Sequence, residues 1–244
     1  MQYINMKAVI LAAGLGNRLG ALTKSTPKAL VTVLGIPLLD HLMQFLSATP
    51  VQSIAVVTGY QTKMLETFVQ KKFPKVQLFY NPDYSLGSIL TLQKALPFLN
   101  ESFLICNVDH IYPKRLAQRL DFSLNAVGAV CDFDRKLGED DMKIKKNPLG
   151  HVIRIDKKLT NFDGGYIGMT FCPKNCHETY WGAAEETLSK KGPKANVEAI
   201  LDTLAPSNPI KIFDASGIGW LEVDTDEDRT QAEETLNNNP KFLN

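Results

Sequence analysis

Residues 7–28 read KAVILAAGLGNRLGALTKSTPK, and this stretch indicates both the fold class and the kind of site to expect. It begins with a continuous apolar run at 8–11. A short apolar run that is ended by small residues is typical of a buried strand in a parallel sheet. The alanine- and glycine-rich residues 12–16 follow at once. Such residues let the backbone turn sharply and bring its N–H groups close to a ligand.

Three cations, Arg18, Lys24 and Lys28, come soon after this turn. A strand, a glycine-containing turn and nearby cations are together typical of a phosphate-binding loop. An ordinary tight β–α loop explains the glycines alone equally well. The stretch is not a Walker A loop, because no Gly-Lys-Ser/Thr follows at the required spacing. It is not a dinucleotide-binding fingerprint either, because Leu19 stands where the third glycine is needed.

The size and charge of the chain exclude several classes of protein. With 244 residues it can bury about 70–75 % of its unfolded surface, so its stability needs neither a metal nor a disulfide. The net charge of +1 argues against a broad basic face for nucleic acid or a membrane surface. No apolar run approaches the ~20 residues of a membrane span, and the N-terminus lacks a signal-peptide core. We therefore expect no nucleic-acid partner and no membrane insertion, in a monomer or a homodimer.

The four cysteines predict a reducing, cytoplasmic environment. Cys172 and Cys176 lie four residues apart and beside His177, which leaves a zinc site as an alternative. No second pair of ligands stands at a usual spacing.

The first half of the chain alternates between apolar runs and amphipathic segments. We expect strands at 8–11, 54–58, 76–80 and 103–108, and helices at 38–46, 64–69 and 88–99. Ser85 or Ser88 is a suitable N-cap for the last of these helices. Such alternation predicts a parallel sheet wound right-handedly, with helices on both faces.

The second half is less regular. We expect strands at 126–131, 152–155, 164–171, 210–213 and 220–223, a mostly helical stretch at 178–205 and a final helix at 225–236. The charged residues 132–146 are expected at the surface, and a hairpin is expected around 216–217. Thr225 and Asp228 form an approximate capping box. Together these patterns predict an α/β, Rossmann-like fold with a mixed, mostly parallel sheet flanked by helices. A single domain is expected over 6–244, preceded by an extension over 1–5.

Two aspartates mark the expected site, because ligands of open α/β sheets bind beyond the carboxyl ends of the strands. Asp109 follows the fourth strand and Asp224 follows the strand at 220–223. A turn or helix-cap role also explains Asp109, and the helix dipole also favours acids such as Asp224 near a helix start. Two strand-end carboxylates beside a phosphate loop nevertheless indicate a Mg²⁺ site, because Mg²⁺ is usually held by one or two carboxylates plus substrate phosphates.

Several strings resemble known signatures. AAGLGNRL at 12–19, followed by LT at 22–23 and TPKAL at 26–30, resembles the signature of the sugar-nucleotide-forming nucleotidyltransferases, roughly G-G-x-G-T-R-L-x-P-L-T and then P-K. Ala13, Asn17 and Ala21 replace its glycine, threonine and proline. NVDHIY at 107–112 resembles the D-H-x-Y version found in CTP:inositol-1-phosphate cytidylyltransferases. IDKKL at 155–159, followed by DGG at 163–165, is similar to the I-G-K-x-L…D-x-G stretch of that family.

This resemblance implies the nucleotide-diphospho-sugar transferase fold and transfer of a cytidylyl group from CTP to inositol 1-phosphate, with release of pyrophosphate. It implies Asp109 and Asp224 as Mg²⁺ ligands. Three basic residues would be catalytic: Arg18 on the β- and γ-phosphates, Lys28 on the α-phosphate and Lys157 on the acceptor phosphate. One more solvated lysine in a basic stretch is the alternative explanation of Lys157. The nucleotide-binding residues would be Leu11, Ala12, Ala13, Gly14, Gly16, Thr58, Gly59, Asn81, Gly87 and Ser88.

Other functions remain open. The acceptor can be phosphocholine, which needs an aromatic cage built from such residues as Tyr84, Tyr112, Tyr166 and Trp220. It can also be a hexose 1-phosphate. A molybdopterin-type nucleotidyltransferase has a similar fold. A regulatory subunit without activity is a different class, but the joint presence of the two aspartates with Arg18 and Lys28 argues against it.

Overall fold

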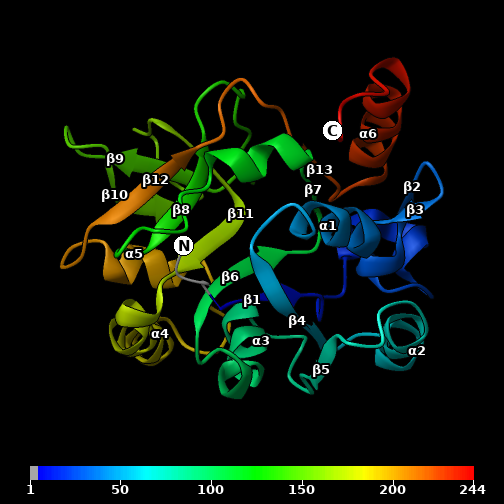
Figure 1. The fold of residues 1–244 in the computed structure, drawn as a ribbon, viewed down its shortest axis with the longest axis horizontal. Helices are drawn as coiled ribbons and strands as arrows, with labels where there is room; N and C mark the ends of the chain where they lie inside the picture. Colours follow the sequence, from blue (N-terminus) through cyan, green and yellow to red (C-terminus); the bar gives the residue numbers. More distant parts are fainter. Residues whose placement is uncertain (1–4) are drawn as a thin grey trace.

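The computed structural model describes residues 5–244 (Figure 1). Most of the predicted extension, residues 1–4, lies outside the described residues. The chain builds a nine-stranded mixed sheet in the order β5-β4-β1-β6-β11-β8-β12-β10-β9, together with two short two-stranded ladders. The prediction of a mixed α/β sheet flanked by helices is confirmed. The expectation that this sheet is mostly parallel was wrong, because four of its strand pairings are parallel and five are antiparallel. That the sheet and its helices form one domain over 6–244 stays a prediction.

The first half of the chain contains the parallel part of the sheet. Its elements, with η for a 3₁₀-helix, are β1 Met6–Leu11, η1 Asn17–Thr23, η2 Lys28–Leu30, β2 Thr32–Val33, β3 Ile36–Pro37, α1 Leu38–Leu46, β4 Val51–Thr58, α2 Thr62–Lys72, β5 Gln77–Tyr80, α3 Ser88–Lys94, η3 Leu96–Phe98 and β6 Ser102–Asn107. Strands β5, β4, β1 and β6 are all parallel neighbours. The four strands expected from the apolar runs are therefore present.

The second half adds the antiparallel part. Its elements are β7 His110–Ile111, η4 Lys114–Arg119, β8 Gly128–Asp132, β9 Lys143–Lys146, β10 His151–Asp156, β11 Gly164–Cys172, η5 Lys174–Cys176, α4 His177–Lys191, α5 Ala199–Leu204, β12 Ile210–Asp214, β13 Leu221–Glu222 and α6 Asp226–Asn238. Strand β11 runs antiparallel to β6 and to β8, and β8 runs parallel to β12. Strands β10 and β9 follow, and β9 also pairs with the start of β11. These pairings close β11, β8, β12, β10 and β9 into a ring.

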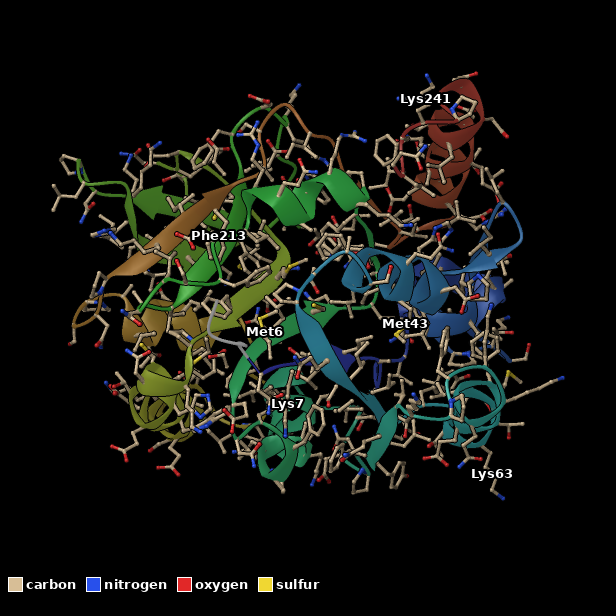
Figure 2. All side chains as sticks on the ribbon, in the orientation of Figure 1. Met6, Lys7, Met43, Lys63, Phe213 and Lys241 are labelled. Atoms are coloured by element: carbon tan, nitrogen blue, oxygen red, sulfur yellow. The ribbon has the colours of Figure 1, made fainter. Side chains whose placement is uncertain are left out.

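The core lies on both faces of the sheet, because alternate residues of a strand point to opposite faces. In β1, Val9 and Leu11 pack on the side of α3, α4 and α5, whereas Ala8 and Ile10 pack on the side of α1 and α2. Helix α6 closes a third cluster with η1 and β2. Figure 1 shows α3 and α4 together on one side of the sheet and α6 apart from them, beside the C-terminus. In Figure 2 the labelled Met6 and Phe213 lie inside the molecule and Lys63 and Lys241 at its periphery.

Two local expectations were wrong, and a third was right only in part. Residues 134–136 and 138–140 are exposed as expected, but 143–146 form β9, in which Lys143 and Ile144 are buried. The Nζ of buried Lys143 donates to the carbonyl oxygens of Lys157 (2.8 Å), Glu139 (3.2 Å) and Asp141 (3.4 Å). No hairpin forms around 216–217, because β12 pairs with β8 and β10 whereas β13 pairs with β7. The N-cap of α3 is Gly87, without a side-chain cap. The capping box of Thr225 and Asp228 is confirmed.

Candidate active site

The sheet brings the predicted loops together at one edge. In the parallel register Leu11 lies beside Val57 on β4 and beside Asn107 on β6. The segments that follow these three strands therefore begin side by side. Two bonds tie the first two of them, from Ala12 N to Val57 O (3.0 Å) and from Tyr60 N to Ala13 O (3.0 Å). The expected gathering of strand ends thus has a direct structural basis.

The predicted phosphate loop lines a cavity of about 360 Å³. Gly16 has a left-handed backbone (φ +65°), and a Cβ there would lie 3.0 Å from the Thr23 methyl and 3.1 Å from Lys28 Cβ. Thr23 Oγ1 donates to Gly16 O (2.9 Å), which closes the loop on itself. Within residues 5–244 the N–H groups of Gly14 and Gly16 have no hydrogen-bond partner. They are therefore free to bind an anion in the cavity that both residues line.

A compact charge cluster forms one wall of this cavity. Lys28 Nζ donates to Asp109 Oδ2 (2.8 Å) and also forms an ion pair with Asp224 Oδ1. The guanidinium of Arg18 pairs with Asp224 Oδ2 and, more weakly, with Asp140 Oδ2 (3.4 Å). The side chains of Lys28, Asp224 and Asp109 are only 12 %, 13 % and 20 % exposed. Burial alone would lower the pKa of Lys28, but Asp109 and Asp224 outweigh it and raise that pKa.

A short antiparallel ladder explains why two aspartates 115 residues apart in sequence meet here. Strand β13 pairs with β7 so that Glu222 faces His110, and Val223 N donates to Asp109 O (2.9 Å). Asp224 follows directly, and its N–H donates to Asp228 Oδ2 (3.1 Å) at the start of α6. The ladder and the helix cap therefore hold the backbone of Asp224 beside Asp109.

The imidazole of His110 orients the carboxylate of Asp109. Its Nδ1 lies 2.7 Å from Asp109 Oδ1, and its ring stacks on Tyr112 and Trp220 at centroid distances of 5.6 and 5.3 Å. Burial would lower the pKa of His110, but Glu222 and Asp109 raise it. Burial would likewise raise the pKa of Asp109, but Lys28 and His110 hold it well below its usual range. Asp109 therefore stays ionised inside the protein.

A second cavity of about 150 Å³ adjoins the first one. The two share Arg18, Asn107, Asp109 and Asp224, so the charge cluster lies at their junction. The second cavity is rich in carboxylates and amides, and its wall includes His110, Asp140, Asp141, Lys157, Tyr166, Asn196, Glu198, Trp220 and Glu222. Burial raises the pKa of Glu222 to about 7, so this carboxyl is partly protonated near neutral pH.

Most of the predicted site residues line these cavities. The first cavity includes Leu11, Ala12, Ala13, Gly14, Gly16, Arg18, Lys28, Ser88, Asp109 and Asp224, and the second includes Lys157. Thr58 and Asn81 instead lie fully buried beneath the loops. The hydroxyl of Thr58 lies 2.7 Å from that of Thr62, and Asn81 Nδ2 donates to Thr91 Oγ1 (3.1 Å). Gly59 packs against Ala13, and Gly87 N donates to Pro193 O (2.8 Å). Residues 58, 59, 81 and 87 thus support the cavity walls.

The sequence reasoning missed Glu198, Glu222 and the placement of Trp220 in the second cavity. Glu198 is buried and accepts a hydrogen bond from Asn107 Nδ2 (3.0 Å). Trp220 donates from Nε1 to Asp132 Oδ2 (2.6 Å). The only sequence signal for Glu222 was its position two residues before Asp224, in a strand where an acid is unusual.

The charge cluster is chemically suited to a divalent cation. Two carboxylates converge on a single ammonium nitrogen, which shows that their oxygens can share one cation. No group of three or more His, Cys, Asp or Glu side chains with the arrangement of a metal site occurs within residues 5–244. A pair of carboxylates that leaves the remaining positions to substrate oxygens and water suits Mg²⁺ rather than zinc. In the same part of the chain, no helix is both long and apolar enough to cross a bilayer.

Comparisons with known proteins agree with this geometry. The family model described as the MobA-like NTP transferase domain matches residues 8–139, which is more than half of the chain. A bifunctional IPC transferase and DIPP synthase from Rubrobacter xylanophilus is 28% identical over 240 residues, covering 94% of this chain and 51% of that protein. The chain thus spans about half the length of such curated relatives.

Two solved structures share the fold. The inositol-1-phosphate CTP transferase from T. maritima superposes with a TM-score of 0.82 at 18% identity, covering 98% of this chain and 96% of that one. The CTP:phosphocholine cytidylyltransferase from Streptococcus pneumoniae superposes with a TM-score of 0.81 at 23% identity, covering 96% of this chain and 100% of that one. The predicted nucleotide-diphospho-sugar transferase fold is therefore confirmed.

Proposed function

Because this chain belongs to the MobA-like NTP transferase family, we propose that it transfers a cytidylyl group from CTP to inositol 1-phosphate and releases pyrophosphate. One observation carries the proposal: two cavities meet at Arg18, Asp109 and Asp224, and the larger cavity, which the glycine loop and Lys28 line, suits a triphosphate. The similarity to the IPC transferase and to the inositol-1-phosphate CTP transferase supports the choice of donor and acceptor.

The larger cavity would hold the nucleotide. The free N–H groups of Gly14 and Gly16 and the guanidinium of Arg18 would bind the β- and γ-phosphates. Lys28, whose stem lies against Gly16, would neutralise charge on the α-phosphate. Tyr84, Leu86 and Ser88 line the same cavity and would contact ribose and base. The fold already places the backbone of these residues, so binding requires only that the side chains of Lys28 and Arg18 turn from the aspartates to the phosphates.

The chemistry requires no strong general base, because an oxygen of the acceptor phosphate is already an anion. That oxygen would attack the α-phosphorus in line, forming one P–O bond while the bond to pyrophosphate breaks. The protein contributes positioning and charge neutralisation by Arg18 and Lys28. Asp109 and Asp224 would hold Mg²⁺, which when bound neutralises charge on the phosphates of both substrates.

The smaller cavity would hold the acceptor, with Lys157 on its phosphate. Its carboxylates and amides, such as Glu198 and Asn196, suit the hydroxyl groups of a polyol. An aromatic cage for a quaternary ammonium is less well supported. Tyr166 and Trp220 line the cavity, but Trp220 already stacks on His110 and lies under the guanidinium of Arg135, 4.3 Å from the ring centroid. The hydroxyl of Tyr112 is bonded to Ile167 O, and Tyr84 lines the other cavity.

The test is a pyrophosphate-release assay of each NTP against inositol 1-phosphate, phosphocholine and glucose 1-phosphate. We expect CTP with inositol 1-phosphate to give the highest kcat/KM, and we expect Lys28→Met and Asp109→Asn to lose at least about a hundredfold. Lys63→Met, on an exposed helix face, is the matched control. Highest activity with phosphocholine would identify the second candidate, and nucleotide binding without turnover would favour a regulatory protein.

We further propose that the protein acts in the cytoplasm, as a monomer or a homodimer. All four cysteines are free thiols, as expected in a reducing compartment. Sedimentation of the purified protein would distinguish the two assembly states.

A further inference from the structure

Both oxygens of each carboxylate that would hold Mg²⁺ already face a donor of this chain. Asp109 uses Oδ1 for His110 Nδ1 (2.7 Å) and Oδ2 for Lys28 Nζ (2.8 Å). Asp224 uses Oδ1 for Lys28 and Oδ2 for Arg18. All four oxygens therefore have a donor, and Lys28 takes the point where the two carboxylates converge.

Two carboxylates and two cations form the centre of this cluster, and His110 and Asp140 flank it. Two aspartates face Lys28 and Arg18, and the Lys28 ammonium is largely screened from water, with 12 % of its side chain exposed. A divalent cation that approached Asp109 and Asp224 would meet the ammonium at the same oxygens and would be repelled at short range in a poorly hydrated site. The cation therefore competes with Lys28 for the two carboxylates.

A triphosphate supplies the reason for Lys28 to leave. The stem of Lys28 lies directly against Gly16 of the phosphate loop, and Arg18 belongs to that loop. Both cations line the same cavity as the free N–H groups of the loop. Rotation of their side chains, with the backbone unchanged, would move them from the aspartates to a bound phosphate chain.

We propose that Lys28 is a built-in competitor of the divalent cation, so that the site of Asp109 and Asp224 becomes available only when a triphosphate draws Lys28 and Arg18 away. This inference rests on the proposed function only in taking the two aspartates as the cation ligands. Since coupling between two ligands is reciprocal, the cation and the triphosphate then strengthen each other's binding. The free protein binds divalent cations weakly, and this restricts the metal to a protein that already holds its nucleotide.

The test measures Mn²⁺ binding to the full chain without nucleotide, by electron paramagnetic resonance of the free ion. The variants are Lys28→Met, which keeps the stem and removes the charge, and Lys24→Met as the matched control on the exposed side of the same loop. We expect Lys28→Met to lower the Kd for Mn²⁺ by at least about tenfold relative to the wild type. We expect Lys24→Met to have the Kd of the wild type for Mn²⁺. We expect the double variant Lys28→Met with Asp109→Asn to lose the higher affinity that Lys28→Met alone shows.

Equal Kd values for the wild type and Lys28→Met would overturn the proposal. A gain that survives Asp109→Asn would also overturn it, because the ion would then bind elsewhere. If Lys28→Met does not fold, Lys28→Gln, which keeps one hydrogen bond to a carboxylate, carries the same comparison. The outcome does not depend on turnover. A tenfold higher Mn²⁺ affinity of Lys28→Met would support this inference even if no substrate pair released pyrophosphate. An active enzyme whose Mn²⁺ affinity is the same in the wild type and in Lys28→Met would reject this inference but not the proposed function.

Discussion

Substituting Gly168 by alanine tests whether His110 is held in place by its surroundings. Gly168 has a left-handed backbone (φ +72°), and a Cβ there would lie 2.7 Å from His110 Cε1 and 2.8 Å from Nδ1. Real Cβ contacts are not this short, so the ring has to move. Because Tyr112 and Trp220 stack on the ring, movement along the stack is restricted and the bond to Asp109 Oδ1 is the contact that gives way.

The expected loss of folding stability in Gly168→Ala is the sum of two contributions. A non-glycine residue in the left-handed region costs about 1–2 kcal/mol, and overpacking a buried site costs about 1–3 kcal/mol. The sum of about 2–5 kcal/mol corresponds to a loss of roughly 4–20 °C in Tm for a chain of this size. Removing the group that orients a metal-binding carboxylate typically costs about 10–100-fold in metal affinity or activity.

The assay is thermal unfolding followed by circular dichroism, together with pyrophosphate release over a range of Mg²⁺ concentrations. Gly182→Ala is the matched control, since Gly182 lies exposed in α4 and a Cβ there would meet nothing within 4 Å. We expect Gly182→Ala to raise stability by about 0.5–1 kcal/mol. Gly168→Ala with the Tm of the wild type and an unchanged Mg²⁺ dependence would refute the placement of His110 described above.

Three further changes probe other parts of the site. Burial raises the pKa of Glu222 to about 7, from 4.5 in the unfolded chain, so the folded state loses stability as the pH rises from about 4.5 to 7. Glu222→Gln should therefore stabilise the protein at pH 8 and have little effect at pH 5, as seen in Tm against pH. The gain at pH 8 should be smaller than the about 3 kcal/mol of the full shift, because the substitution also removes the attraction between Glu222 and His110. Thr225→Ala should lose about 1 kcal/mol through the capping box, whereas Thr225→Ser should retain the stability in the same melts. Lys157→Met should raise KM for the acceptor several-fold and leave KM for CTP unchanged in steady-state kinetics, and an equal effect on both would contradict its placement on the acceptor.

Much of the fold follows from local sequence because the central strands are continuous apolar runs, as in β1 and β6. Strand β9 could not be found in this way. Its sequence, Lys-Ile-Lys-Lys, has a single apolar residue, and Lys143 is tolerated inside only because carbonyl groups of residues 139, 141 and 157 accept its ammonium hydrogens. Whether these hydrogen bonds of the Lys143 ammonium group can form depends on the tertiary fold, which no local sequence pattern encodes.

The residues of the candidate site were likewise predictable from the sequence only in part. The predicted phosphate loop is contiguous in sequence, so its glycines and Arg18 could be recognised together. The roles of Thr58 and Asn81 were not, because a strand end specifies a position but not the direction of a side chain, and both turn into the interior. The stack of His110 between Tyr112 and Trp220 depends on the β13–β7 ladder, which joins segments about a hundred residues apart.

The same ladder makes the two aspartates of the cluster unequal. Asp109 is held by His110, which is itself packed between two aromatic rings, so its Oδ2 keeps one direction whatever Lys28 does. Both carboxylate oxygens of Asp224 face flexible cations, Lys28 and Arg18, and only its backbone is fixed, by Asp228. If phosphate groups attract those cations as proposed, Asp109 would remain as a preorganised ligand and Asp224 would gain freedom to adjust. One rigid and one adjustable carboxylate suit a site that must accept the differing oxygen positions of substrate and product phosphates.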